Sequence, residues 1–344
     1  MAYTTINKPS DYFNTVLYTG NGSTQSITGV GFQPDMVWTK NRSSATNHYI
    51  TDVVRGATET LRTNTTGAES TQSGGLTSFD SDGFSIGSDN AINQSGNNLV
   101  GWSWLAGGTA SENTQGDITS QVSANTTAGF SIVSYTGTGS DGTIGHGLGA
   151  TPDIMIIKDR DSGTSNWVVY TTLIDGSMDY LILESTSAKG DSGATAPTST
   201  LINIPSGTNV NASGNRYIAY CFANKKGFSK FGTYTGNGSA DGTFVYTGFK
   251  PAFVIVKRTD SSTNGNWVMH DSARGGSNVI DARLFPNTSD AESSNGNGAI
   301  DFLSNGFKYR TSSDGQNGSG NAMIYMAFAE NPLVGTNNIP ATAR

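Results

Sequence analysis

The chain has 344 residues, of which 44 are glycine and only 14% are charged, and its formal net charge is −7. This length accommodates two or three domains, and an acidic balance without a run of Lys or Arg excludes an electrostatic nucleic-acid interface. Disorder is also excluded, because short apolar and aromatic runs that can be buried recur along the whole chain.

The chain begins with the polar segment MAYTTINKPS, residues 1–10, which we expect to act as a docking segment. It lacks the basic and apolar regions of a signal peptide, and no stretch of the chain has the roughly 18 apolar residues needed to span a bilayer. We therefore expect synthesis in a cytosol and no membrane insertion. The one cysteine, Cys221, excludes an intrachain disulfide, and its apolar neighbours predict a small buried side chain.

Residues 11–108 contain four motifs in a fixed order. YTGNGS begins at Tyr18, GFQPDMVWTKNR at Gly31, NHYITD at Asn47 and SGNNLVGWSWLAG at Ser95. The apolar runs are short, rich in β-branched and aromatic residues, and bounded by Gly, Pro and Asn, which predicts strands rather than helices.

The same four motifs return in residues 129–227 and 228–332, so the chain is predicted to be a tandem triplication with units of about 100 residues. Alignment brings two residue types into register three times. These are Pro34, Pro152 and Pro251, and Lys40, Lys158 and Lys257.

The segments between and after the units have a different composition. Residues 109–128 are rich in Gly, Ser, Thr and Asn, which predicts a linker or a short accessory hairpin and permits the first unit to hinge. Units 2 and 3 follow one another directly and are expected to be rigidly coupled. Residues 333–344 form a Pro-containing C-terminal extension that is expected to be open and extended.

The predicted fold class is all-β, with three tandem antiparallel β-sandwich units that resemble jelly rolls. Tryptophans recur within the apolar runs. A sugar-stacking platform is one interpretation, but flanking residues that alternate as in buried strands favour a core role. The residues concerned are Trp102, Trp104, Trp167 and Trp267.

The glycines of YTGNGS raise the possibility of a phosphate cradle. Nucleotide-binding loops of this kind are followed by a helix, whereas here a second short strand is expected, so we interpret the motif as the turn of an opening β-hairpin. Three histidines, His48, His146 and His270, occupy non-equivalent repeat positions without metal-ligand spacing. His270 with Asp271 is a weak candidate for a catalytic triad, because no nucleophile elbow accompanies it.

Two pairs of carboxylates precede glycine, Asp80 with Asp82 and Asp159 with Asp161. They resemble the start of a calcium loop but lack its closing Glu, so turn formation is favoured over calcium binding. The densest basic group, Lys225, Lys226 and Lys230, is interpreted as a solvated junction. No catalytic, cofactor-binding or metal-binding residue is therefore predicted, and the ligand-binding residues are left unassigned.

The longer motifs resemble a family of repeat-containing virion proteins of tailed bacteriophages that is common in marine phages. The resemblance rests on YTGNGSTQSITGVGFQPDMVWTKNRSS, DITSQVSANTTAGFSIVSYTGTG, SKFGTYTGNGSADGTFVYTGFKPAFVIVKRTD and YMAFAENP, and it covers nearly all of the chain, from about Asp11 to Pro332. It implies a structural or tail-fibre protein of the virion and supplies no catalytic residues.

The leading hypothesis from the resemblance and the polar loops is a tail fibre or tail-associated adhesin that contacts a host surface glycan or receptor. Its expected partners are other virion proteins and further copies of itself, with a trimer favoured, and its expected location is the virion after synthesis in the bacterial cytoplasm. The first alternative is a capsid decoration or cement protein, which docks through its terminal segments. The second alternative is a virion enzyme that degrades polysaccharide through a pair of carboxylates.

Overall fold

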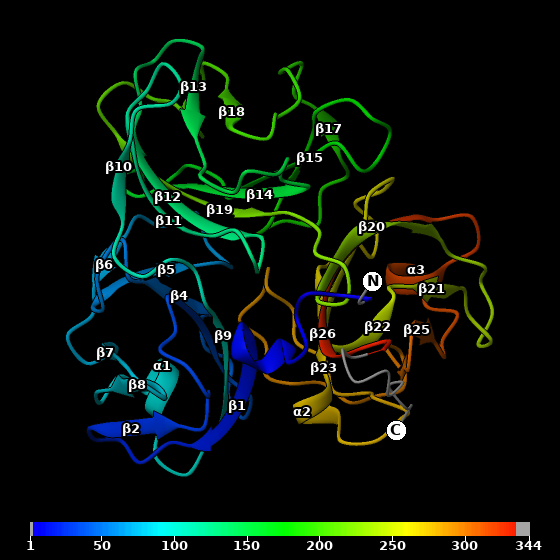
Figure 1. Ribbon diagram of the computed structural model, residues 1–344. Coiled ribbons are helices and arrows are strands. Elements are labelled where there is room, and N and C mark those ends of the chain that lie inside the picture. Colours follow the sequence, from blue (N-terminus) through cyan, green and yellow to red (C-terminus); the bar gives the residue numbers. More distant parts are fainter. Residues whose placement is uncertain (1–2, 335–344) are drawn as a thin grey trace.

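The computed structural model describes residues 3–334 and confirms the all-β prediction. Each of the sheets is antiparallel in its strand pairing, and the helices within the described residues have no more than four residues. Figure 1 shows three bodies arranged around a common centre, one for each predicted unit. None of the helices in this range is long and apolar enough to cross a membrane.

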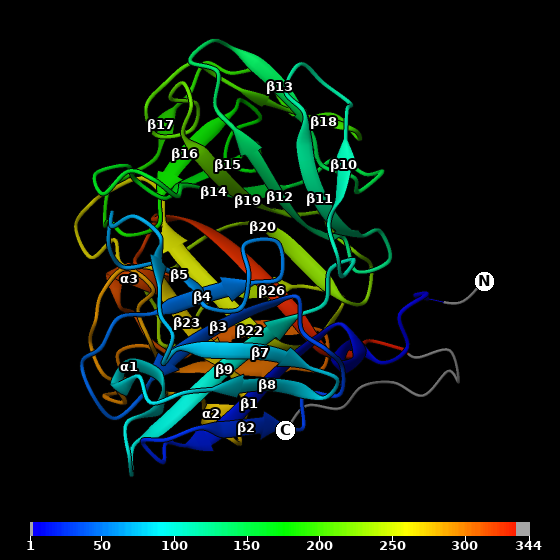
Figure 2. The same ribbon diagram turned by 90° about the vertical axis from the view of Figure 1, so that its left-hand side faces the viewer.

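Unit 1 contains a six-stranded sheet, in the order β1-β9-β3-β4-β5-β6, and a three-stranded sheet, in the order β2-β8-β7. In Figure 2 the smaller sheet lies in front of the larger one. The elements are β1 (Phe13–Thr19), β2 (Gln25–Thr28), β3 (Met36–Asn41), β4 (Tyr49–Asp52), β5 (Glu59–Arg62), β6 (Ser70–Thr71), β7 (Leu76–Asp80), β8 (Gly83–Ile86), α1 (Asn90–Asn93) and β9 (Asn98–Trp104).

Unit 2 contains an eight-stranded sheet, in the order β10-β11-β12-β19-β14-β15-β16-β17, and a two-stranded sheet, β13-β18. The strands are β10 (Ser111–Asn113), β11 (Ser120–Asn125), β12 (Phe130–Thr136), β13 (Gly142–Gly145), β14 (Ile154–Asp159), β15 (Val168–Thr171), β16 (Asp179–Ile182), β17 (Gly190–Asp191), β18 (Leu201–Ile204) and β19 (Arg216–Phe222). Of the two interpretations of residues 109–128, the linker is wrong and the accessory hairpin is confirmed, because β10 pairs with β11 as a hairpin and β11 also pairs with β12.

Unit 3 contains a four-stranded sheet, β20-β26-β22-β23, and a three-stranded sheet, β21-β25-β24. The elements are β20 (Ser229–Thr235), β21 (Phe244–Tyr246), β22 (Phe249–Arg258), β23 (Val268–Asp271), α2 (Ser272–Gly275), β24 (Ile300–Leu303), β25 (Gly306–Tyr309), α3 (Asp314–Asn317) and β26 (Ala322–Pro332). The order β1-β9-β3-β4 in unit 1 recurs as β12-β19-β14-β15 in unit 2 and as β20-β26-β22-β23 in unit 3, so the repeat is visible in the strand pairing.

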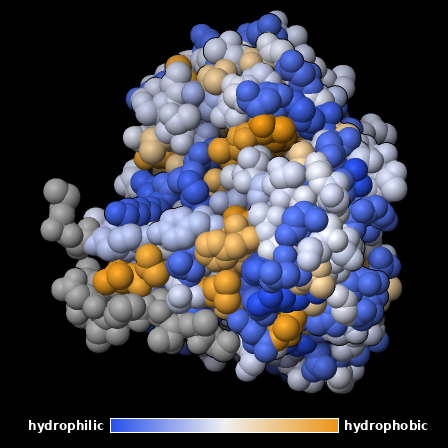
Figure 3. All heavy atoms as spheres, turned by 90° about the vertical axis from the view of Figure 1, so that its right-hand side faces the viewer, coloured by the Kyte–Doolittle hydropathy of each residue, from blue (hydrophilic) through white to orange (hydrophobic). Residues whose placement is uncertain are grey.

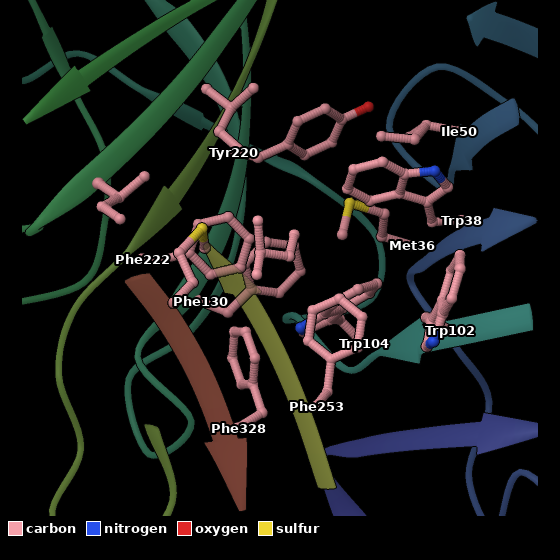
Figure 4. Packing of buried hydrophobic residues seen from close by; sticks show 14 of the residues in the cluster. Met36, Trp38, Ile50, Trp102, Trp104, Phe130, Tyr220, Phe222, Phe253 and Phe328 are labelled. Carbon is pink, nitrogen blue, oxygen red and sulfur yellow. The ribbon is translucent and has the colours of Figure 1, made fainter. Parts of the chain in front are cut away.

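Each large sheet is buried on both faces. One face packs against the small sheet of its own unit, over three separate apolar clusters. The other face packs against the large sheets of the other two units in a single central core (Figure 4). Its aromatic members include Trp38, Trp102 and Trp104 from unit 1, Phe130, Trp167 and Phe222 from unit 2, and Phe253, Trp267 and Phe328 from unit 3. A shared core of this kind does not fit the predicted hinge after unit 1.

Burial on both faces explains the third strand of each unit. All six residues of β3, MVWTKN, and all six of β14, IMIIKD, are buried. Strands with one solvent face alternate between apolar and polar residues, whereas strands covered on both faces carry nearly continuous apolar runs.

The YTGNGS motif is a sheet-to-sheet connection, so the hairpin interpretation is wrong. The strands before and after it, β1 and β2, belong to different sheets of unit 1. A fully buried asparagine holds the turn: Asn93 Nδ2 donates to the carbonyl oxygen of Ser23 at 2.5 Å, and Asn93 Oδ1 accepts from the backbone N–H of Asn21 at 2.9 Å. Asn211 and Asn317 make the same pair of contacts in units 2 and 3.

The glycines of the motif have a steric role. A Cβ atom on Gly20 would lie 2.2 Å from the carbonyl oxygen of Gln94, and Gly22 has a φ of 73°. Such a close approach and a positive φ both favour glycine. The Tyr18 hydroxyl donates to the carbonyl oxygen of Ile92 at 2.9 Å, next to the asparagine that holds the turn. The motif therefore joins the two sheets of a unit, and close packing and turn geometry account for its glycines.

The predicted N-terminal docking segment contacts the protein's own second and third units. The Tyr3 hydroxyl donates to the carbonyl oxygen of Gly248 at 2.7 Å, and Thr4 Oγ1 donates to that of Lys226 at 2.6 Å. Ile6 is buried in the central core, and the 3-10 helix η1 (Pro9–Asp11) leads into β1. Of the predicted C-terminal extension, Leu333 donates its N–H to Gly248, while residues 335–344 lie outside the described residues.

The three aligned lysines join the units into a ring. Each is fully buried, and its ammonium group donates to a backbone carbonyl of another unit. The three hydrogen bonds run from Lys40 to Ser289 O, from Lys158 to Thr66 O and from Lys257 to Thr186 O, at 3.2, 2.8 and 2.9 Å. Unit 1 thus contacts unit 3, unit 2 contacts unit 1, and unit 3 contacts unit 2, through equivalent positions.

Backbone hydrogen bonds repeat the same pattern. They join Glu292 N to Arg42 O, Glu69 N to Arg160 O and Lys189 N to Thr259 O, at 2.9, 2.8 and 2.8 Å. At two interfaces the side chains of the same residues also form a bidentate ion pair, between Arg42 and Glu292 and between Arg160 and Glu69. The third interface lacks this pair, because its positions hold Thr259 and a lysine.

A buried network supports the two charged interfaces. Asp271 accepts from Arg274 Nε at 2.5 Å and from Trp102 Nε1 at 3.0 Å, and Arg274 also bonds to Glu292. At the second interface the corresponding residues are Asp52, Arg55, Tyr220 and Glu69. At the third interface the corresponding positions hold Thr171, Ile174 and Met326, so that contact is apolar.

The buried lysines make stability dependent on pH. Burial lowers the pKa of Lys158 from 10.5 to about 8, and it does the same for Lys40 and Lys257, so all three are charged at neutral pH. Between pH 8 and 10.5 the unfolded chain binds more protons than the folded chain, so the free energy of unfolding rises with pH. One pKa unit corresponds to about 1.4 kcal/mol, which gives each lysine a rise of about 2 kcal/mol between pH 8 and 9.5.

Urea unfolding at pH 7.5, 8.5 and 9.5 measures this rise, and the Lys158→Met variant isolates one lysine. The variant is expected to show about two thirds of the rise of the unaltered protein, because two of the three lysines remain. An equal rise in both proteins would contradict the assignment. Lys226→Met is the matched control. Lys226 lies over the aromatic ring of Tyr3 and takes no part in the three lysine contacts between units, so this variant should show the full rise.

A candidate binding cleft on the second unit

Two adjoining hollows of about 550 and 530 Å³ lie on unit 2. Both are lined by Ser192, Pro205 and Ser206, so they form one cleft, which we call the unit 2 cleft. Its two walls are residues 187–195 and residues 205–210. Sites for small ligands have volumes of about 300–1,000 Å³, so each hollow is large enough to hold one.

The unit 2 cleft lies where unit 2 lacks a strand. The small sheets of units 1 and 3 have a third strand, β7 and β24, whereas the small sheet of unit 2 has only β13 and β18. The third strands contribute Leu76 and Ile300 to their cores. The matching stretch of unit 2, SGATAPTST, has small side chains such as Ala194 in their place. Small residues leave space over the large sheet that the other two units fill.

The floor of the cleft is the face of the large sheet that packs against the small sheet of unit 2, on the opposite side from the central core. Val168 pairs with Ile182, and Tyr170 pairs with Tyr180, across β15 and β16. All four belong to or pack against the core of unit 2 and also line the cleft. A Cβ atom on Gly190 would lie 2.5 Å from the Tyr180 ring, so the backbone of β17 packs against this ring and fixes it.

The floor and the adjacent wall carry polar groups that the protein does not use. Asn209 Oδ1 accepts from the backbone N–H of Asn166 at 2.9 Å. Among residues 3–334, no partner is present for the side-chain amide of Asn166, the Asn209 NH₂ group, or the hydroxyls of Tyr170 and Tyr180. Burial raises the pKa of Tyr170 to about 12, so its hydroxyl keeps its proton and can donate. The cleft thus offers several free donors and acceptors above an apolar floor.

The wall formed by residues 205–210 is fixed from behind. Its carbonyl oxygens at Thr208 and Val210 accept from the hydroxyls of Tyr217 and Tyr135, at 3.1 and 2.6 Å. The next residue, Asn211, is the buried asparagine that holds the YTGTGS turn of unit 2. The repeated motif therefore positions a wall of the cleft, although it does not contact the hollow through its glycines.

The charge around the cleft is negative. Asp117, Asp141 and Asp191 line it, and within the described residues none of the three forms an ion pair. The one lysine of the lining, Lys189, is neutralised by two carboxylates, Asp175 and Asp179. Hydrogen bonding from Ser206 lowers the pKa of Asp141, so this carboxyl is ionised at neutral pH.

The ionisation of Asp141 bears on glycoside hydrolysis. That reaction requires a carboxylic acid with a raised pKa to protonate the leaving oxygen, together with a second carboxylate. Asp117 and Asp141 line the same hollow, but the lowered pKa of Asp141 is the opposite of what the acid needs. Asp141 therefore suits the role of the second, ionised carboxylate and not that of the acid.

A family model described as a domain of unknown function (DUF7483) matches residues 8–332. The chain belongs to this family. No curated protein and no solved structure matches the chain. The match extends over all three units of this family member, so the ring and the cleft lie within the family's own boundaries.

The tryptophans that raised the possibility of a sugar platform are core residues, as the alternation predicts. Trp102, Trp104, Trp167 and Trp267 are at most 3% exposed and lie in the central core. Trp167 and Trp267 donate to backbone carbonyls of a neighbouring unit, at Arg62 and Ile182. They stabilise contacts between units and do not reach a ligand.

The histidines and the cysteine are also buried. The predicted triad pair does not form, because Asp271 bonds to Trp102 and Arg274 rather than to His270. Burial lowers the pKa of His270 to about 3, so it is neutral at physiological pH. Cys221 is fully buried, and burial raises the pKa of its thiol to about 12.

The carboxylates considered for calcium form turns. Asp82 accepts from the backbone N–H groups of Gly29 and Gly31, at 3.1 and 2.7 Å. Asp161 pairs with Arg216, and Asp159 accepts from five groups in its surroundings. Among the described residues, no group of three or more His, Cys, Asp or Glu is placed to hold a metal ion.

The residues of the cleft are not apparent from motifs, because they lie where unit 2 departs from the repeat. A signal is nevertheless present in the alignment of the units. Leu76 and Ile300 stand at apolar positions of units 1 and 3 where unit 2 has only small and polar residues. The absence of a core residue from one copy of a repeat predicts an opening in that copy.

Proposed function

We propose that the protein is a structural protein of a tailed-bacteriophage virion, and that it serves as a tail fibre component or tail-associated adhesin that contacts the host surface. The single observation that carries the contact role is the unit 2 cleft. It combines an apolar floor with unused donors and acceptors, and rigid elements hold both. Binding sites are typically concave, largely apolar and equipped with a few fixed polar groups.

The rest of the fold supports this proposal. Three units joined by a common core and by equivalent interfaces form a rigid body, which suits a part that transmits force between a particle and a cell. Polar loops connect the strands of the units, and loops that a rigid scaffold positions are where binding residues are usually found. Further copies of the chain and other virion proteins are the partners that this role requires.

Binding of the purified, fluorescently labelled protein to susceptible host cells tests the proposal. We expect saturable binding that competes with phage adsorption, and no binding to resistant cells that lack the receptor. Protein that binds neither cell type, and that leaves phage adsorption unchanged at saturating concentration, would refute the adhesin role.

A capsid decoration protein is the second candidate, and one observation favours it. Phe244 and Tyr246 on β21 are 44% and 53% exposed, whereas the matching outward positions of β2 hold Ser26 and Thr28. β21 is an edge strand of its sheet, and it lies on the side of the molecule that Figure 3 faces, where hydrophobic patches are separate and small. An exposed aromatic pair on an edge strand suits docking onto another protein.

Immunogold labelling of intact virions separates the two candidates. Label on the tail supports the adhesin, and label confined to the head supports decoration. The Phe244→Ser/Tyr246→Thr variant, which copies unit 1, adds a second readout: loss of incorporation into virions with retained cell binding assigns β21 to docking.

A further inference from the structure

We propose that the unit 2 cleft binds an uncharged saccharide chain, with the apolar faces of its rings over the sheet floor and its hydroxyls on the free amides and tyrosine hydroxyls. This inference rests on the proposed function and names the ligand class of the same site.

The floor provides the apolar contact. Val168 and Ile182 lie beside the paired Tyr170 and Tyr180, and all four are held by the large sheet. A sugar ring has faces of C–H groups that can be buried against such a surface while its hydroxyls remain at the edge. Burial of apolar area contributes about 25 cal/mol per Å² and is not directional. The floor therefore contributes affinity but does not discriminate between sugars.

The polar groups provide the match to hydroxyls. An asparagine amide offers both a donor and an acceptor, and a tyrosine hydroxyl can do either, which is the combination that a sugar hydroxyl needs. The free groups on Asn166, Asn209, Tyr170 and Tyr180 lie around one hollow. Asn209 already holds the Asn166 backbone, and Gly190 packs against Tyr180. Because these side chains are already ordered, they lose little conformational freedom when a ligand binds.

The charge decides against acidic saccharides. Three carboxylates, Asp117, Asp141 and Asp191, line the cleft without cationic partners among the described residues, and Lys189 is already neutralised. Recognition of uronic or sialic acid groups uses positively charged or N–H-rich surfaces, because like charges placed together cost several kcal/mol. An uncharged chain avoids this repulsion and pairs its hydroxyls with the carboxylates at the rim.

The experiment uses the full chain and oligosaccharides released from the host surface polysaccharide, separated by anion exchange into a neutral and an acidic fraction. Binding of each fraction is measured by calorimetry at 50 and 300 mM NaCl. We expect the neutral fraction to bind with an affinity that salt changes less than about twofold, since uncharged ligands are not screened.

Three variants place the binding in the cleft. Tyr180→Phe and Asn166→Ala each remove one neutral hydrogen-bonding group and are expected to weaken binding of the neutral fraction about 3- to 10-fold. Ala194→Leu restores the apolar bulk that units 1 and 3 have at the third strand, and it is expected to abolish binding while the protein stays folded. Tyr246→Phe, on the exposed tyrosine of unit 3, is the matched control with unchanged binding.

Each outcome has a separate meaning. Binding of the acidic fraction in preference to the neutral one, or binding of the neutral fraction that none of the three cleft variants weakens, overturns the inference. If the protein binds susceptible cells but neither fraction, the ligand class is wrong and the adhesin role stands. If it binds neither cells nor fractions, both proposals fail.

Discussion

Replacing Arg274 by isoleucine is expected to lower the free energy of unfolding by about 3–5 kcal/mol, because removing one partner of a buried ion pair leaves an uncompensated charge. The side chain of Arg274 is fully buried and forms ion pairs with Asp271 and Glu292. Without this side chain, the hydrogen bonds that remain to the Asp271 carboxylate come from Trp102 Nε1–H and from the backbone N–H of residue 274. Urea unfolding at pH 7 measures the loss.

The repeat supplies the matched control. Unit 2 has Thr171 and Ile174 at the positions of Asp271 and Arg274, and Ile174 packs there against the apolar central core. The Asp271→Thr/Arg274→Ile double variant copies this pair and removes the stranded charge. It should be more stable than the single variant, since an apolar replacement of a complete ion pair is often neutral. A double variant that is less stable than Arg274→Ile would show that the charge is not the cause.

The second large effect is expected at Phe328, where alanine should cost about 3–5 kcal/mol by leaving a cavity in the central core. The Phe328 ring lies 5.1 Å from that of Phe13, 5.7 Å from Trp104 and 5.9 Å from Phe222, so it contacts rings of units 1 and 2 from unit 3. Differential scanning calorimetry measures the loss and also reports whether the units still unfold together.

Two further variants of the core separate volume from location. Phe328→Leu keeps most of the volume and should cost less than about 1.5 kcal/mol. Phe84→Ala removes an equally buried ring that belongs only to the core of unit 1. We expect both alanine variants to be destabilised, but only Phe328→Ala to split or broaden the calorimetric transition. A single sharp transition for Phe328→Ala would mean that the central core does not couple the units.

The sequence predicts the strands and the repeat because both depend on local patterns. Runs such as those around Trp38 and Ile156 are apolar, short and bounded by turn residues, and three copies of the motifs align without a structure. The aligned lysines are also visible in the sequence. The role of these lysines cannot be read from the sequence, because the carbonyl oxygen that accepts from Lys158 belongs to Thr66 of a different unit.

The errors arose where the deciding contact is distant in the chain. Asn-Gly between two short strands is a hairpin signal, yet the connection at Asn21 is held by Asn93, which has no local signature. Similarly, a Gly- and Thr-rich segment such as residues 109–128 has the composition of a linker. It forms strands because the free edge of β12 is available to pair with Ser120–Asn125.

The candidate site was missed for a different reason. Its residues, including Tyr180 and Asn209, carry no motif, and the hollow depends on side chains that are absent from one unit rather than present. Composition and spacing describe what a chain contains. A comparison between its own copies is needed to see what one copy omits.

The ring of interfaces has a consequence for the order of the chain. Tyr3 and Leu333 both donate to the carbonyl oxygen of Gly248, so the two ends of the described chain lie next to each other. A circular permutant that opens at Thr109 and joins Leu333 to Tyr3 through a short linker places units 2, 3 and 1 in sequence, and we expect it to form all three contacts. In such a closed ring the fold depends on which neighbour each unit contacts, and each junction between units is equivalent to the gap between the chain ends.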